Sequence, residues 1–136
     1  MSSKTSVESP EFFVDRSLGK QTAQELRAKG WALTLLADVY PADAQKVKDE
    51  DWIAYGCRKG WSLLTKDAHI RYRAKEIAAL SPKSLLFCLS RQDLKIAEMV
   101  VAFEIARPTI ERAIRNGRAG FYHVSKAGQV RRMPTT

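Results

Sequence analysis

The chain has 136 residues, 45% of them hydrophobic, and carries a formal net charge of +8. That length is enough for one domain with a full core and too short for two, and the hydrophobic content excludes wholesale disorder. Residues 1–10 are polar, and no later segment is long enough to span a membrane. We therefore expect a flexible tail followed by a single domain, residues 11–136, in a cytoplasmic protein.

The positive charge is confined to the second part of the chain. Residues 1–60 contain 9 Lys and Arg against 9 Asp and Glu, whereas residues 61–136 contain 14 against 6, an excess of 8. A basic surface of this kind suits a polyanion such as nucleic acid, because contacts to phosphates release condensed counterions. A solvated surface that only keeps the protein soluble would have the same charge, so charge alone does not decide between the two.

The first elements predicted are a strand, a helix and a second strand. Residues 12–14 are apolar and end at Asp15, and the spacing of apolar residues then predicts a helix from Leu18 that stops at Gly30. Residues 31–36 form a second apolar run, which is followed by another acid, Asp38. Both predicted strands therefore end at a carboxylate.

A helix and a strand of similar length follow. Acidic residues from Asp49 onward begin a helix that stops at Gly60, and residues 61–65 form a buried strand before Asp67. The helix rises by about 15 Å and the strand returns by nearly the same distance, at about 1.5 and 3.3 Å per residue. Asp49 and Asp67 should therefore lie near each other.

The remaining elements are another buried strand, a helix and a terminal hairpin. Residues 84–90 are nearly all apolar, as the strands of parallel sheets are. Ser90 with Asp93 is predicted to cap the next helix, and Pro108 either kinks that helix or starts a new one. Residues 120–133 resemble a hairpin, or a last sheet strand followed by an extension. The predicted buried face of the helix consists of Leu94, Ala97, Val100, Val101 and Ile105.

The two cysteines do not form a recognisable site. Cys57 falls on the helix after Asp49, and Cys88 in the strand of residues 84–90. They have neither the spacing of a metal site nor the density of a disulfide scaffold, so we expect both to be reduced and buried.

Strands that alternate with helices form a parallel sheet, in which all the carboxyl ends lie along one edge. Asp15, Asp38 and Asp67 end three different strands, and Asp49 begins the helix that points back to that edge. Singly, each acid has a structural explanation as a helix cap or a turn residue. Together they favour a site for Mg²⁺ or Mn²⁺, which prefer oxygen ligands and offset the repulsion between carboxylates.

Several segments of the chain form recognisable motifs: 13–19, 49–53 and 64–67, the helix end at Leu26, Arg27 and Gly30, and Gly60-Trp with Lys66-Asp-x-x-Ile-Arg71. These motifs resemble those of PIN-domain nucleases, in particular the PIN-like branch of VapC-type toxins of toxin–antitoxin pairs. The resemblance covers residues 11–125 and is most specific over 49–71. It implies an α/β fold, a three-layer sandwich around a central, mostly parallel sheet.

Carried over to this chain, the resemblance implies that Asp15, Asp49 and Asp67 are catalytic carboxylates that bind the metal. The family has a further acid between the first and third of these, and in this chain the spacing between them is compressed. Asp38 is the candidate for this acid, and Glu50 and Asp51 are the alternatives. The implied reaction is hydrolysis of RNA phosphodiester bonds by metal-activated water, with Mg²⁺ or Mn²⁺ as cofactor.

Residues close to the last acid are candidates for binding RNA. Thr65 could orient an acid or a water molecule, and Arg71, Arg73 and Lys75 could hold phosphates near the ions, although a solvated basic loop would have the same composition. A further stripe of Arg112, Arg115 and Arg118 is usable for RNA or is only the exposed face of the last helix.

Three functions remain open on the sequence. The first is a ribonuclease toxin, whose partners would be RNA and an antitoxin protein, with a homodimer common in the resembled family. The second is an RNA-binding module of the same fold without catalysis. The third is a receiver-like domain that accepts a phosphoryl group, against which the terminal hairpin argues.

Overall fold

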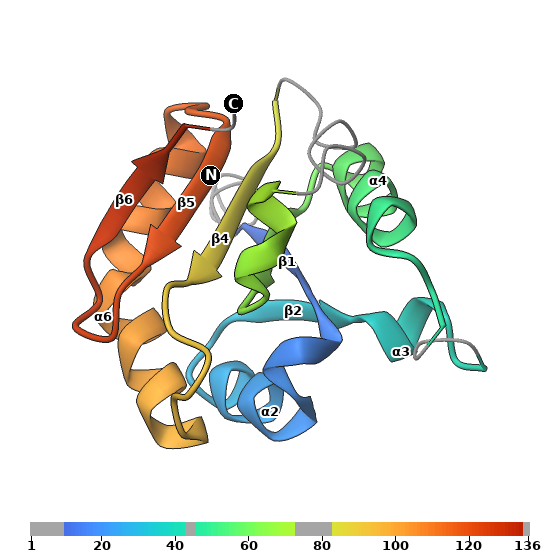
Figure 1. Ribbon diagram of the computed structural model, residues 1–136, viewed down its shortest axis with the longest axis horizontal. Helices are drawn as coiled ribbons and strands as arrows, with labels where there is room; N and C mark the ends of the chain where they lie inside the picture. The colour runs from blue at the N-terminus through green and yellow to red at the C-terminus, as the bar shows by residue number, and fades with distance from the viewer. Residues whose placement is uncertain (1–9, 43–45, 73–82, 135–136) are drawn as a thin grey trace, which may run out of the picture.

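The computed structural model describes residues 10–42, 46–72 and 83–134 (Figure 1). Its strands are β1 (Glu11–Val14), β2 (Ala32–Leu35), β3 (Ser62–Thr65), β4 (Leu85–Leu89), β5 (Gly120–Val124) and β6 (Val130–Met133). Its helices are α2 (Lys20–Ala28), α3 (Leu36–Val39), α4 (Asp49–Lys59) and α6 (Ile96–Arg115), and its 3-10 helices are η1 (Arg16–Leu18) and η2 (Ala68–Tyr72). The predicted tail, residues 1–10, lies outside the described residues except for Pro10.

The described strands form one sheet in the order β2-β1-β3-β4-β5-β6. All neighbouring strands are parallel except β5 and β6, which form an antiparallel hairpin, the first of the two predicted alternatives. The carboxyl ends of β1 to β5 therefore lie along one edge, which is called the carboxyl edge below, and their amino ends lie along the opposite edge.

Helices cover both faces of this sheet, which confirms the three-layer α/β fold. On one face, Phe12 and Val14 of β1 pack in a core with α2 and α6. On the other face, Phe13 packs in a second core with α4 and η2. Figure 1 shows α6 running behind β5 and β6. In the described residues, no helix has the length and apolar character that crossing a bilayer requires.

A glycine lets α4 approach the sheet closely. A Cβ atom placed on Gly56 would lie 2.6 Å from Leu63 Cδ2 and 3.0 Å from Phe13 Cδ2. The helix ends as predicted at Gly60, whose φ of +77° is a left-handed conformation that glycine adopts without strain. The bounds of α4 place Asp49 in its first turn, near the carboxyl edge.

The start of α6 differs from the prediction. The helix begins at Ile96, and the Glu98 carboxylate accepts a hydrogen bond of 2.8 Å from the Lys95 backbone N–H. The predicted cap by Ser90 and Asp93 is wrong, because Asp93 instead pairs with Arg91 at 2.7 Å. A carboxylate one turn inside the helix performs the capping.

The predicted buried face of α6 is also partly wrong. Ala97 is exposed, and Val101 and Ile105 are 53% and 56% exposed. Met99, Phe103 and Ile110 are buried instead. Pro108 neither ends the helix nor starts another, since α6 is continuous through it. Pro108 lies on the exposed side, where the carbonyl group that loses its hydrogen bond can be solvated.

Candidate active site

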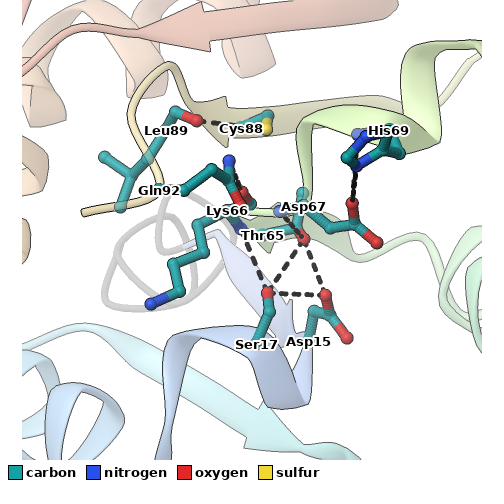
Figure 2. A network of polar contacts seen from close by, with 9 residues as sticks. All are labelled: Asp15, Ser17, Thr65, Lys66, Asp67, His69, Cys88, Leu89 and Gln92. Atoms are coloured by element: carbon teal, nitrogen blue, oxygen red, sulfur yellow. Dashed lines mark hydrogen bonds and ion pairs between the residues drawn. The ribbon is translucent and has the colours of Figure 1, made fainter. Parts of the chain in front are cut away.

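Asp15 lies at the end of β1 and is the most enclosed acid of the carboxyl edge. It is 3% exposed. Its Oδ2 atom accepts two hydrogen bonds of 2.7 Å, one from the Ser17 hydroxyl and one from the Thr65 hydroxyl. Figure 2 shows both hydroxyl groups directed at this carboxylate. Because both donors contact the same oxygen, the orientation of the carboxylate is determined from two sides.

The pairing of β1 with β3 brings these groups together. The ladder continues past the end of β1, where the Asp15 N–H donates to Leu64 O at 2.9 Å. Thr65, the last residue of β3, therefore lies beside Asp15. Its hydroxyl oxygen also accepts a hydrogen bond of 3.0 Å from the Asp67 N–H. A single hydroxyl thus connects the acids that follow two adjacent strands.

Burial has the largest effect on the pKa of Asp15 and raises it above its usual value, although the hydroxyl donors of Thr65 and Ser17 act in the opposite direction. The negative charge of Asp49 raises the pKa further, and Arg16 lowers it slightly. Asp15 and Asp49 therefore interact electrostatically, although they are 34 residues apart in the sequence. A cation beside Asp15 would offset both the burial and the repulsion.

Asp49 and Asp67 each have local partners. The Asp49 Oδ1 atom accepts a hydrogen bond of 2.9 Å from the buried indole of Trp52. The Asp67 Oδ1 atom accepts a hydrogen bond of 3.0 Å from the His69 N–H and lies 3.5 Å from His69 Nδ1. These contacts hold Asp49 at the start of α4 and Asp67 at the start of η2.

Asp38 does not end a strand as predicted, because the chain turns into α3 directly after β2. Its Oδ2 atom accepts a hydrogen bond of 2.9 Å from the Leu35 N–H and lies 3.3 Å from Arg27 Nη2. The side chain is 52% exposed and lines, together with Asp15, a cavity of about 480 Å³ between α2 and α3. Asp38 therefore has a structural role, because it caps α3 and pairs with Arg27. A part in metal binding stays a prediction.

Asp15, Asp49 and Asp67 offer carboxylate oxygens, the ligands that fit a hard divalent cation. In the part of the chain that the structure describes, however, no three His, Cys, Asp or Glu side chains are grouped closely enough to hold a metal ion. The chemistry of the donors therefore fits Mg²⁺ or Mn²⁺, and their described positions do not form a complete set of ligands.

The predicted substrate-binding residues are placed unequally. Thr65 is buried, and its hydroxyl contacts Asp15, so its described contacts are those of a residue that orients an acid. Arg71 lies in η2, while Arg73 and Lys75 fall outside the described residues. Contact of these basic residues with RNA stays a prediction.

Ser17 is the main residue that the sequence analysis missed. Besides donating to Asp15, its hydroxyl accepts a hydrogen bond of 3.2 Å from the Lys66 N–H, and so joins η1 to the end of β3. Gln92 also contacts this segment, by donating from Nε2 to Lys66 O. A hydroxyl residue two positions after a strand-ending acid is the signal that would have identified Ser17.

Cys88 lies in β4, close enough to Asp15 and Asp67 to interact with their charges. Burial raises the pKa of its thiol to about 12, and Asp67 and Asp15 contribute to the rise. The prediction that both cysteines are free is confirmed, and Cys88 is buried as expected. Cys57 is only partly buried, because it lies at the border of the core beneath α4.

The fold and this edge define an α/β domain with acidic side chains at the carboxyl ends of a parallel sheet. A family model described as "PIN like domain" matches residues 10–91, which is more than half of the chain. The chain belongs to the PIN-like domain family. No curated protein and no solved structure matches it.

The match shows which part of the chain is similar to the family. Residues 10–91 contain all four candidate acids and strands β1 to β4, whereas α6, β5 and β6 lie beyond it. Membership of the PIN-like family suggests a nuclease-type function. The candidate acids lie where a parallel α/β sheet binds its ligands, at the carboxyl ends of the strands.

Proposed function

We propose that the protein is a metal-dependent endoribonuclease that hydrolyses RNA phosphodiester bonds. The observation that carries the proposal is the buried carboxylate of Asp15, which two hydroxyl donors hold through a single oxygen at the carboxyl edge. A buried acid with a raised pKa is unfavourable for stability, and such groups are concentrated at functional sites. Membership of the PIN-like family supports the same function.

In this proposal Asp15, Asp49 and Asp67 hold Mg²⁺ or Mn²⁺. When bound, the ion would lower the pKa of a water molecule and stabilise the charge that develops at the phosphate. Ser17 and Thr65 act as positioning residues, because their hydrogen bonds to Oδ2 leave the orientation of Asp15 little freedom. Arg71, Arg73 and Lys75 would contact the phosphates of the RNA.

The more specific assignment that we propose is a VapC-type toxin of a type II toxin–antitoxin pair, acting in the cytoplasm. It is supported by the motifs from Asp49 to Arg71 that resemble that branch of the family. An antitoxin would then cover the acidic edge or the basic surface. Self-association into a dimer would be compatible with this function.

The decisive experiment is cleavage of pooled RNA by the purified protein with Mg²⁺, with Mn²⁺ and with chelator. Asp49→Asn and Asp67→Asn should each remove the metal-dependent cleavage. Asp93→Asn is the matched control, since Asp93 is an exposed acid that pairs with Arg91. Cleavage that persists in the first two variants, or that resists chelation, would refute the proposal.

A second candidate is an RNA-binding module without catalysis. The observation in its favour is that the described acids do not form a complete set of metal ligands and that Asp38 is paired with Arg27. This candidate predicts RNA binding that weakens steeply with salt, needs no metal and leaves the RNA intact. The receiver-like alternative is not retained, because the chain belongs to the PIN-like family.

A further inference from the structure

Three arginines from different segments line one cavity at the amino edge of the sheet. The cavity has a volume of about 230 Å³. Arg112 comes from the last turn of α6, Arg118 from the turn after it, and Arg132 from β6. Thr109 and Asn116 add polar groups. No acidic residue is among the described residues that line this arginine cavity.

The arginine cavity is separate from the candidate active site. Helix α6 begins after β4, at the carboxyl edge, and its last turn reaches the opposite edge, where β5 begins. A helix of 20 residues is about 30 Å long at about 1.5 Å per residue. Figure 1 shows this helix running the length of β5 and β6. A ligand in the cavity would therefore not contact Asp15.

Arg132 is held in position by the backbone around it. Its Nη2 atom donates a hydrogen bond of 2.6 Å to Ala119 O. Gly120 makes room for the guanidinium, since a Cβ atom there would lie 2.9 Å from Arg132 Nε. The φ of Gly120, +144°, also favours glycine. The position of one charge in the cavity is therefore set before any ligand arrives.

The other two arginines have no carboxylate partner in the part of the chain that the structure describes. Among the described residues, neither Arg112 nor Arg118 forms an ion pair, whereas Arg107 on the same helix pairs with both Glu104 and Glu111. Favourable interaction with the carboxyl end of α6 explains one basic residue in its last turn. It does not explain Arg118 and Arg132, which lie outside the helix and line the same cavity.

We propose that the arginine cavity binds a phosphate group, and that the phosphate belongs to an RNA strand. Guanidinium groups match the geometry of phosphate oxygens and remain charged at all physiological pH values. The choice of RNA rests on the proposed function, whereas the phosphate site rests on the cavity alone.

The test compares two double variants that lose the same charge. Arg112→Ala/Arg118→Ala removes two arginines of the cavity, and Arg58→Ala/Lys59→Ala removes two exposed cations at the end of α4. Binding of a fluorescent single-stranded RNA of about 20 nucleotides is measured in chelator over a range of salt concentrations, so neither metal nor cleavage is needed. Folding of each variant is checked by circular dichroism.

We expect the cavity variant to bind RNA about tenfold more weakly, with a salt dependence reduced by about two counterions, and the control variant to change less than about twofold. Gly120→Ala, which keeps the net charge, should also weaken binding by displacing Arg132. Equal losses in both double variants, or no loss in either, would overturn the RNA assignment.

A second arm uses inorganic phosphate in place of RNA. Saturable changes in the NMR signals of the arginine side chains, absent in Arg112→Ala/Arg118→Ala, would support the phosphate site. If these changes occur while RNA binding is unaffected, the RNA assignment fails and a free phosphate compound is the ligand class. If phosphate causes no saturable change, the site itself is refuted. Both binding experiments are independent of the cleavage assay. If the wild-type protein proves to have no nuclease activity, their results keep the same meaning.

Discussion

Replacing Thr65 by valine tests how the candidate active site is held together. Valine has nearly the same shape as threonine, so the packing at the end of β3 is kept, while the hydroxyl is removed. The variant loses the 2.7 Å hydrogen bond from Thr65 to Asp15 and the 3.0 Å hydrogen bond from the Asp67 N–H to Thr65. Ser17 remains as the other donor to Asp15.

The cost follows from the two hydrogen bonds. A hydrogen bond to a charged group contributes about 1.5–3 kcal/mol, and one between neutral groups about 0.5–1.5 kcal/mol. We expect the free energy of unfolding of Thr65→Val to fall by roughly 2–4 kcal/mol. For a domain of this size, at about 3–5 °C per kcal/mol, Tm should fall by roughly 6–20 °C. Thermal unfolding followed by circular dichroism measures this.

Thr65→Ser is the matched control, because it keeps the hydroxyl and loses only a buried methyl group, at a cost of about 0.5–1.5 kcal/mol. Losing a donor should also raise the pKa of Asp15 further, so cleavage by Thr65→Val should begin at a higher pH than cleavage by Thr65→Ser. If Thr65→Val is as stable as Thr65→Ser, the hydroxyl does not hold the site and the reasoning is wrong.

Three further predictions concern stability and reactivity. Because burial raises the pKa of Asp15 in the folded protein, the folded state resists ionisation, so Asp15→Asn should stabilise the protein at neutral pH. That gain should vanish below the usual aspartate pKa, as unfolding at several pH values would measure. Iodoacetamide should modify Cys57 in the native protein and Cys88 only after unfolding, because Cys88 is buried and its pKa is raised to about 12. Gly56→Ala should lower the free energy of unfolding by about 1 kcal/mol, since overpacking against Leu63 exceeds the gain in helix propensity.

Each of these predictions has a contradicting outcome. A pH-independent effect of Asp15→Asn would mean that ionisation of Asp15 does not determine its contribution to stability. Native labelling of both cysteines at equal rates, read by mass spectrometry, would place the Cys88 thiol at the surface. An increase in Tm for Gly56→Ala would show that α4 can move away from the sheet without cost.

The sequence predicted the parts of the fold that depend on local pattern. The apolar runs that became β1, β3 and β4 are buried on both faces, and α4 has the expected acidic start and glycine stop. Parallel pairing then places Asp15 and Asp67 at the same edge, because that consequence follows from topology alone. The position of a residue at a strand end was thus predictable, but its contacts were not.

The parts that were not predicted depend on partners distant in the sequence. Asp38 follows an apolar run as Asp15 does, but its carboxylate pairs with Arg27 and accepts a hydrogen bond from the Leu35 N–H at the start of α3. Ile105 was assigned to the core by its spacing, whereas in the fold it meets Gly128 of the terminal hairpin and remains more than half exposed. No periodicity within α6 carries information about where the hairpin lies.

The hairpin that ends the sheet also affects how the protein behaves in a crowded solution. Among the described residues, β6 is the last strand of the sheet and pairs only with β5, so its outer edge has backbone groups that another strand could bind. Arg131 and Arg132 are exposed on this strand, and Pro134 follows it directly. Positive charges repel a second copy of the same edge, and proline cannot donate a ladder hydrogen bond. The strand that closes the fold therefore also protects it against edge-to-edge aggregation.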